Sequence, residues 1–107
     1  MNLPLTGIKI VELSNYVAAP SSARLLADLG AEVIKIEAHG GDAWRRVGNS
    51  VTRRGDEENP IFDILNMGKQ SICLNIKDEK GMEVLMRMLE EADVFITNTR
   101  AKSLVKL

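Results

Sequence analysis

The sequence contains few of the residues on which secreted and metal-binding domains depend. Its 107 residues include one cysteine, Cys73, and one histidine, His39. An internal disulfide is therefore excluded, and so is a metal site built from several cysteine and histidine ligands. We accordingly expect a cytoplasmic protein with no bound metal.

An excess of either charge and a long apolar segment are also absent. The 14 Lys and Arg residues nearly balance the 15 Asp and Glu residues, so there is no basic field of the kind that holds nucleic acid. No segment approaches the roughly 18 apolar residues that a membrane span needs, and residues 1–7 do not resemble a secretion signal. We expect neither a nucleic-acid partner nor a membrane partner.

What is present is enough apolar sequence for one small domain, residues 1–107, of which 45% are hydrophobic. Alternation of β-branched and polar residues predicts strands. Residues with helical spacing, beginning at Pro20 and ending before Gly30, predict a helix. The expected strands are residues 8–13, 32–37, 70–76 and 94–98, and the expected helices are residues 20–29, 78–92 and 102–107.

The order of these elements predicts an α/β fold, a Rossmann-like parallel sheet with flanking helices. A strand, a helix and a second strand fill the first 37 residues, which favours a parallel pair with a right-handed crossover. In the helix over residues 78–92, we expect Asp78 to cap the first turn and Met82, Leu85, Met86 and Leu89 to form the apolar face.

Residues 38–69 form a long irregular connection within the domain, with one short helix expected over residues 61–66. Connections of this length in small domains usually have a function. Its four arginines either pair with the acidic residues 56–58 or contact a ligand. These arginines are Arg45, Arg46, Arg53 and Arg54.

The turn after the first strand excludes a dinucleotide fingerprint. That motif needs glycines so that the backbone can approach a pyrophosphate, whereas residues 14–20 contain none. We therefore interpret Glu37 as a solvated acid at a strand end. The small side chains of Ala18 and Ala19 still permit close approach of an anion to the start of the helix, or they serve only in packing.

Cationic and hydrogen-bonding residues follow the third and fourth strands, at the edge where open α/β sheets bind ligands. They are either a strip for phosphate groups or ordinary solvated charges. The strip consists of Lys77, Asn98, Thr99, Arg100, Lys102 and Lys106.

No catalytic group of residues is apparent. Cys73 alternates with apolar residues in a strand, so we expect it to be buried as a small apolar side chain. His39 has no carboxylate or thiol at a suggestive spacing.

Longer stretches of the chain resemble the family III CoA-transferases, the CaiB/BaiF family. The likeness covers essentially the whole chain in register. It is carried by residues 3–14, 19–20, 26–37, 41–42, 66–72, 74–77, 81, 91–94 and 97–100.

This resemblance implies the incomplete N-terminal, CoA-binding part of a larger protein that forms interlocked homodimers. The family moves CoA from an acyl-CoA donor to a carboxylic acid acceptor through an anhydride and a thioester on an aspartate. That aspartate would lie downstream of Leu107, so no catalytic residue is expected in this chain. The substrates are coenzyme A thioesters and carboxylic acids, and no metal is implied.

The resemblance also implies residues that bind CoA. These are Val17, Ala18, Leu74, Asn75, Ile76, Lys77, Asn98, Thr99, Arg100 and Lys106. In a first departure from the family, Ala38 stands where many members carry an arginine, so Lys69, Lys77 or a neighbour would supply that cationic contact. In a second, residues 97–104 replace a common Glu-Asn-Phe-Arg-Pro-Gly pattern and look more like the branch that acts on 2-hydroxy acids.

Two further functions stay open at this stage. One is an α-methylacyl-CoA racemase of the same family, whose proton-transfer residues would also lie downstream. The other is a short, non-catalytic module that binds CoA or serves in assembly.

Overall fold

Four parallel strands in the order β3-β2-β1-β4 organise the computed structural model, which describes residues 2–47 and 59–107. Residues with β-branched and apolar side chains dominate the central strands, as expected for strands that are covered on both faces. The strands are β1 (Lys9–Leu13), β2 (Glu32–Glu37), β3 (Gln70–Cys73) and β4 (Val94–Thr97).

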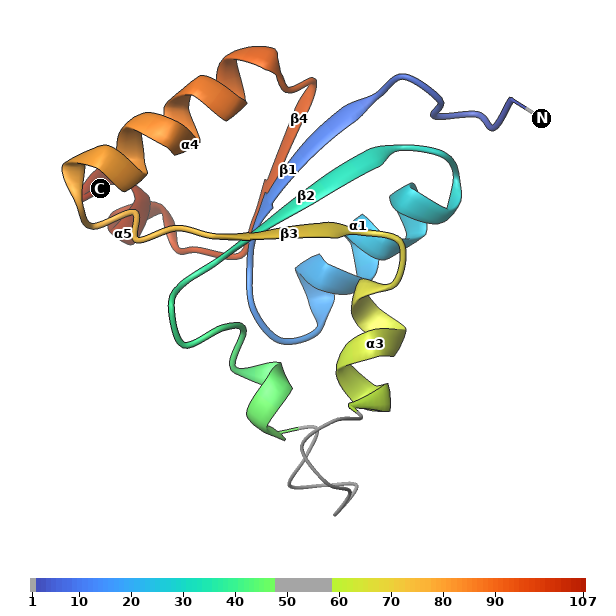
Figure 1. Ribbon diagram of the computed structural model, residues 1–107, viewed down its shortest axis with the longest axis horizontal. Helices are drawn as coiled ribbons and strands as arrows, with labels where there is room; N and C mark the ends of the chain where they lie inside the picture. Colours follow the sequence, from blue (N-terminus) through green and yellow to red (C-terminus); the bar gives the residue numbers. More distant parts are fainter. Residues whose placement is uncertain (1, 48–58) are drawn as a thin grey trace.

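The helices cover both faces of this sheet (Figure 1). Helices α1 (Ala18–Asp28) and α3 (Pro60–Asn66) lie on one face, and α4 (Glu79–Glu91) lies on the other. The short α5 (Ala101–Val105) follows β4 beyond the carboxyl ends of the strands. A further helical segment begins at residue 44.

In the part of the chain that the structure describes, no helix is both long and apolar enough to cross a membrane.

The core divides into two layers because successive residues of a strand point to opposite faces. Ile10 and Val33 pack with Ala23 of α1 on one face. Val11 and Ile36 pack with Leu85 of α4 on the other. All six of these residues are buried.

The predicted fold class and the order of strands and helices are confirmed, and most differences lie at the ends of elements. The third strand ends at Cys73 instead of residue 76. The Leu74 N–H still bonds the Glu37 carbonyl of β2 at 2.9 Å, and the chain then turns, with the Asp78 N–H bonded to the Asn75 carbonyl at 3.1 Å. Helix α1 begins at Ala18, which leaves Pro20 in the first turn, where its missing N–H has no helical acceptor to lose.

Two expectations for α4 are wrong in detail. Asp78 occupies the N-cap position, but its side chain makes no capping hydrogen bond. Met86 is half exposed, and Met88 packs against the core with Met82 and Leu89 instead.

Candidate functional site at the carboxyl edge of the sheet

A cavity of about 510 Å³ opens where all four strands end. Helix α1 lies on one face of the sheet and connects β1 to β2, its neighbour on one side. Helix α4 lies on the opposite face and connects β3 to β4, the neighbour of β1 on its other side. The loops that leave the carboxyl edge in these two directions separate next to β1, which creates the usual ligand crevice of open α/β sheets. The cavity is lined by Leu13, Asn15, Ile36, Glu37, Ala38, His39, Leu74, Asn75, Ile76, Lys77, Thr99, Ser103 and Leu107.

The lining combines an apolar surface with a polar rim. Leu13, Ile36 and Leu74 present apolar side chains, whereas Asn75 and Lys77 provide an amide and a cation. A few polar groups around a mainly apolar pocket of this size are typical of sites for organic ligands. The arrangement suits a ligand that has a flat apolar part and an anionic part.

The structure brings half of the predicted site residues together in this cavity. Five of the ten line it: Leu74, Asn75, Ile76, Lys77 and Thr99. The other five are exposed and stand outside the lining: Val17, Ala18, Asn98, Arg100 and Lys106.

The five residues outside the lining lie on neighbouring turns. Val17 is the N-cap of α1, Ala18 is the first residue of that helix, and Arg100 and Lys106 flank α5. The side chain of Asn98 bonds the backbone of Asn15, through both the carbonyl oxygen at 2.7 Å and the N–H at 3.3 Å.

Eight lining residues were not among those predicted to bind a ligand: Leu13, Asn15, Ile36, Glu37, Ala38, His39, Ser103 and Leu107. His39 has no thiol at a suggestive spacing in the sequence, but in the fold its Nδ1 lies 3.3 Å from Sγ of Cys73. Cys73 is exposed, contrary to prediction, since β3 is an edge strand. The sequence does not reveal the contact between His39 and Cys73. It arises from the parallel register of β2 and β3, which sets Glu37 opposite Cys73 and so brings His39 close to the thiol.

Among residues 2–47 and 59–107, no group of three or more acidic, histidine and cysteine side chains is placed to hold a metal ion.

Glu37 is buried, not solvated as predicted from its position at a strand end. Both of its carboxylate oxygens accept hydrogen bonds from Arg45, at 2.8 Å each. Ser71 and the Asp42 N–H donate to the same carboxylate. Burial alone would raise the pKa of Glu37, but these hydrogen bonds, led by that of Arg45, lower it to about 2. The carboxylate therefore stays ionised beside the cavity.

Two arginines of the connection have partners among the described residues. Arg45 pairs with Glu37, and Arg46 donates to the Gly40 carbonyl at 2.9 Å. The proposed partners at residues 56–58, together with Arg53 and Arg54, lie outside the described residues.

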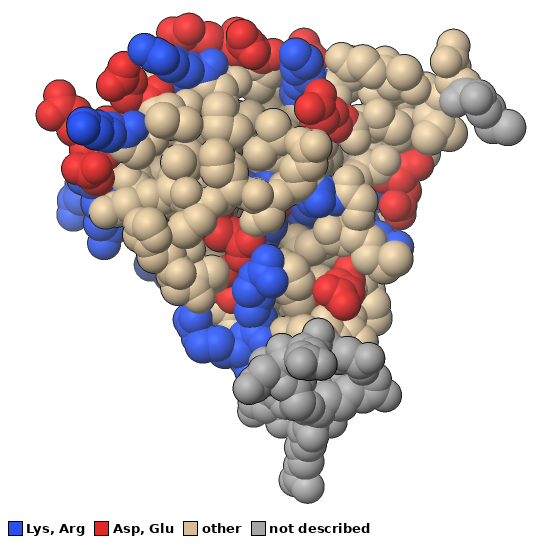
Figure 2. Space-filling view, in the orientation of Figure 1, with Lys and Arg blue, Asp and Glu red and all other residues tan. Residues whose placement is uncertain are grey.

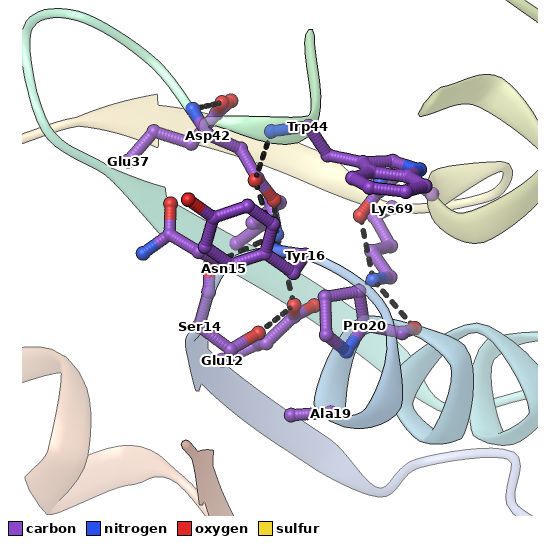
Figure 3. A network of polar contacts seen from close by, with 12 residues as sticks. Glu12, Ser14, Asn15, Tyr16, Ala19, Pro20, Glu37, Asp42, Trp44 and Lys69 are labelled. Atoms are coloured by element: carbon purple, nitrogen blue, oxygen red, sulfur yellow. Dashed lines mark hydrogen bonds and ion pairs between the residues drawn. The ribbon is translucent and has the colours of Figure 1, made fainter. Parts of the chain in front are cut away.

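A buried network of two lysines and two carboxylates lies behind the loop that follows β1 (Figure 3). Lys35 Nζ is 3.0 Å from Glu12 and 2.9 Å from Asp42, and Lys69 Nζ is 2.7 Å from Glu12. All four side chains are almost fully buried. Their opposite charges compensate one another, which buried ions require.

Lys69 is therefore not the free cation that could replace the missing arginine at Ala38. Its ammonium group also donates to the Pro20 carbonyl and the Asn66 side chain. Burial lowers the pKa of Lys69, and the hydrogen bond to Glu12 works in the opposite direction. Of the two named candidates for that contact, only Lys77 lies on the cavity.

Comparison with known proteins places this architecture in a family of enzymes. The sequence profile of CoA-transferase family III matches residues 5–107. The chain is 45% identical over 104 residues to (R)-2-hydroxy-4-methylpentanoate CoA-transferase of Clostridioides difficile, covering 96% of this chain and 26% of that protein. It is 49% identical over 102 residues to cinnamoyl-CoA:phenyllactate CoA-transferase of Clostridium sporogenes, covering 94% and 25%.

Solved structures agree. A CAIB/BAIF family protein from Brucella suis superposes with a TM-score of 0.89 at 39% identity, over 99% of this chain and 28% of that protein. The chain spans about a quarter of the length of the curated relatives it matches.

Proposed function

This chain belongs to CoA-transferase family III, and on that premise we propose that its cavity binds the nucleotide end of a CoA thioester. The observation that carries the proposal is that Leu74–Lys77 and Thr99, five residues implied by the family resemblance, line one cavity at the carboxyl edge of the sheet. The apolar lining suits a purine ring, and Lys77 supplies a cation for phosphate oxygens.

The reaction we propose for the whole protein is exchange of CoA between two acids through covalent intermediates. A carboxylate of an aspartate downstream of Leu107 attacks the donor thioester, and CoA thiolate leaves as an acyl-aspartyl anhydride forms. The thiolate then attacks the aspartyl carbonyl, which releases the donor acid and leaves an aspartyl-CoA thioester. The acceptor carboxylate repeats the two steps in reverse, so that the acceptor leaves as its CoA thioester and the aspartate is regenerated.

The acceptor class that we propose is a 2-hydroxy acid. The relatives from C. difficile and C. sporogenes act, by their names, on 2-hydroxy-4-methylpentanoate and phenyllactate. Their identity to this chain is 45% and 49%, compared with 37% for a succinate–glutarate CoA-transferase of Agrobacterium fabrum. We expect the full-length protein, as a homodimer, to transfer CoA to 2-hydroxy acids faster than to succinate, and the 107-residue chain alone to transfer none. Exchange of the α-hydrogen without transfer would instead indicate a racemase.

The binding proposal is tested with a matched pair of lysine variants. Lys77→Ala removes the cavity cation and should raise the Kd for CoA about tenfold, the loss of one charge-assisted phosphate contact of roughly 1.4 kcal/mol. Lys80→Ala removes an equally exposed lysine from α4, outside the cavity lining, and should leave the Kd within about twofold. Isothermal titration calorimetry with CoA measures both. Equal affinity in all three proteins would contradict a site at Lys77.

A further inference from the structure

The loop between β1 and α1, residues 14–17, is held by side chains from three other segments. The Ser14 carbonyl accepts a hydrogen bond from Lys35 Nζ at 3.2 Å, and the Tyr16 N–H donates to Asp42 Oδ1 at 3.1 Å. Between them, the N–H and the carbonyl of Asn15 both bond the side chain of Asn98. Both polar groups of two successive peptide units are thus bonded to distant side chains.

The loop needs this support because its conformation is intrinsically unfavourable. Tyr16 has a φ of +66°, in the left-handed region that residues with a side chain seldom adopt. The left-handed conformation is unfavourable for such a residue because its Cβ comes too close to the following carbonyl oxygen. Asp42, which bonds Tyr16, is itself held by Lys35 and accepts from the Trp44 N–H at 2.9 Å. Figure 3 shows Tyr16 and Trp44 lying over this network.

Asn15 connects the loop to the cavity. Its side chain accepts a hydrogen bond from the Ala43 N–H at 3.3 Å, which links the loops after β1 and β2. Asn15 lines the cavity, as do Ala38 and His39 from the second loop. The conformation at Asn15 therefore sets the shape of one wall.

We propose that Asn98 is a positioning residue, which fixes the backbone of Asn15 and thereby pre-forms this wall for the CoA thioester; the inference rests on the proposed function. Both polar groups of the Asn98 amide are engaged by Asn15, and Asn98 does not line the cavity. Asn98 acts on the ligand through Asn15. A site held in its bound shape before the ligand arrives avoids the cost of ordering a loop on binding.

The test compares Asn98→Ala with Asp93→Ala. Asp93 bonds the backbone of β1 at the amino edge of the sheet, where it accepts from the Lys9 N–H at 2.8 Å. Asn98→Ala removes two bonds to the loop after β1, and Asp93→Ala removes one bond to β1 itself. Asn98→Ala should speed amide hydrogen exchange at Asn15 and raise the Kd for CoA about tenfold, equivalent to ~1.4 kcal/mol. Asp93→Ala should speed exchange at Lys9 and leave the Kd unchanged.

A conservative variant separates positioning from general loss of stability. Asn98→Asp keeps the size of the side chain and an acceptor for the Asn15 N–H, but it sets a carboxylate oxygen against the Asn15 carbonyl oxygen in place of the donor. The two oxygens repel, so the Kd of Asn98→Asp should be at least as high as that of Asn98→Ala. Unchanged exchange at Asn15 in Asn98→Ala, or an unchanged Kd despite faster exchange, would overturn the inference. If the wild-type protein binds no CoA, the proposed function is wrong, and no rise in the Kd of Asn98→Ala can be measured. If only exchange at Asn15 stays unchanged, the proposed function stands and the role of Asn98 does not.

Discussion

At the scale of single residues, Glu37 shows how the end of a strand becomes a buried ionic site. The carboxylate lies at the last residue of β2, where Arg45 covers it with two hydrogen bonds and Ser71 approaches from β3. Arg45 in turn stacks over Phe62 of α3, with its guanidinium carbon 3.9 Å from the ring centroid. One ion pair therefore links β2, the segment after it and α3.

We predict that Glu37→Gln lowers the free energy of unfolding near pH 7 by about 1–2 kcal/mol, a range kept small because Arg45 is partly exposed. The pKa of Glu37 is about 2 in the folded protein, against 4.5 ordinarily. Its contribution is therefore present above pH 4.5 and is lost as the pH falls toward 2. Urea denaturation at pH 7 and pH 3 should show the difference between wild type and variant shrinking with acid.

Glu83→Gln is the control for this pH dependence, because Glu83 pairs with Arg87 at 3.0 Å on the exposed surface of α4. Its effect should stay below about 0.5 kcal/mol at both pH values. If the difference in the free energy of unfolding between wild type and Glu37→Gln does not change with pH, the low pKa of Glu37 is contradicted.

The residues that sequence reasoning misjudged share one cause. Glu37 was expected to be solvated and Cys73 to be buried, and each expectation came from the residue's local neighbours. Their environments depend on strand order and register, which set Glu37 beside Cys73 and make β3 an edge strand. Lys77 could be predicted to lie at the cavity because ligand sites follow the carboxyl ends of parallel strands, whereas Leu74, Asn75 and Ile76 were implied by the family resemblance.

At the scale of secondary-structure elements, α4 and the segment that precedes it are in direct contact. A Cβ atom added at Gly81 would lie 1.9 Å from the Asn75 carbonyl oxygen and 2.7 Å from its carbon. Both atoms belong to the backbone and cannot move aside like a flexible side chain. The glycine thus lets the first turn of α4 pack against the wall of the cavity that Asn75 forms.

We predict that Gly81→Ala displaces this turn, lowers the free energy of unfolding by about 1–3 kcal/mol and weakens CoA binding. Gly40→Ala is the matched control, since among the described residues a Cβ there would meet only the Arg46 side chain, at an ordinary 3.7 Å. Urea denaturation and CoA titration of the two variants measure both effects. A stable Gly81→Ala variant with wild-type affinity would show that the contact does not shape the site.

Elements whose signals are local were the most predictable. The alternation over residues 32–37 predicted β2 with its observed bounds, Glu32–Glu37. The end of β3 was not predictable, because apolar residues continue through Leu74 and Ile76 after the chain has left the sheet. Those two side chains face the cavity and the core beneath α4 without being in a strand.

At the scale of the whole molecule, charge is distributed without a dominant sign. Acidic and basic side chains alternate over α4, whereas uncharged side chains cover much of the centre of the same view (Figure 2). With a formal net charge of −1, the protein cannot attract an anionic ligand through a broad field. The proposed recognition of CoA therefore depends on contacts within the cavity.

The measurement that tests this account most directly is amide chemical-shift mapping of the protein during titration with CoA. The largest shifts should appear at Asn75, Lys77 and Thr99, around the cavity at the carboxyl edge. A smaller cavity of about 140 Å³ at Lys9, Glu32 and Met88 serves as an internal control and should show none. Shifts confined to that second cavity, or no shifts at millimolar CoA, would contradict the assignment of the carboxyl edge as a CoA site.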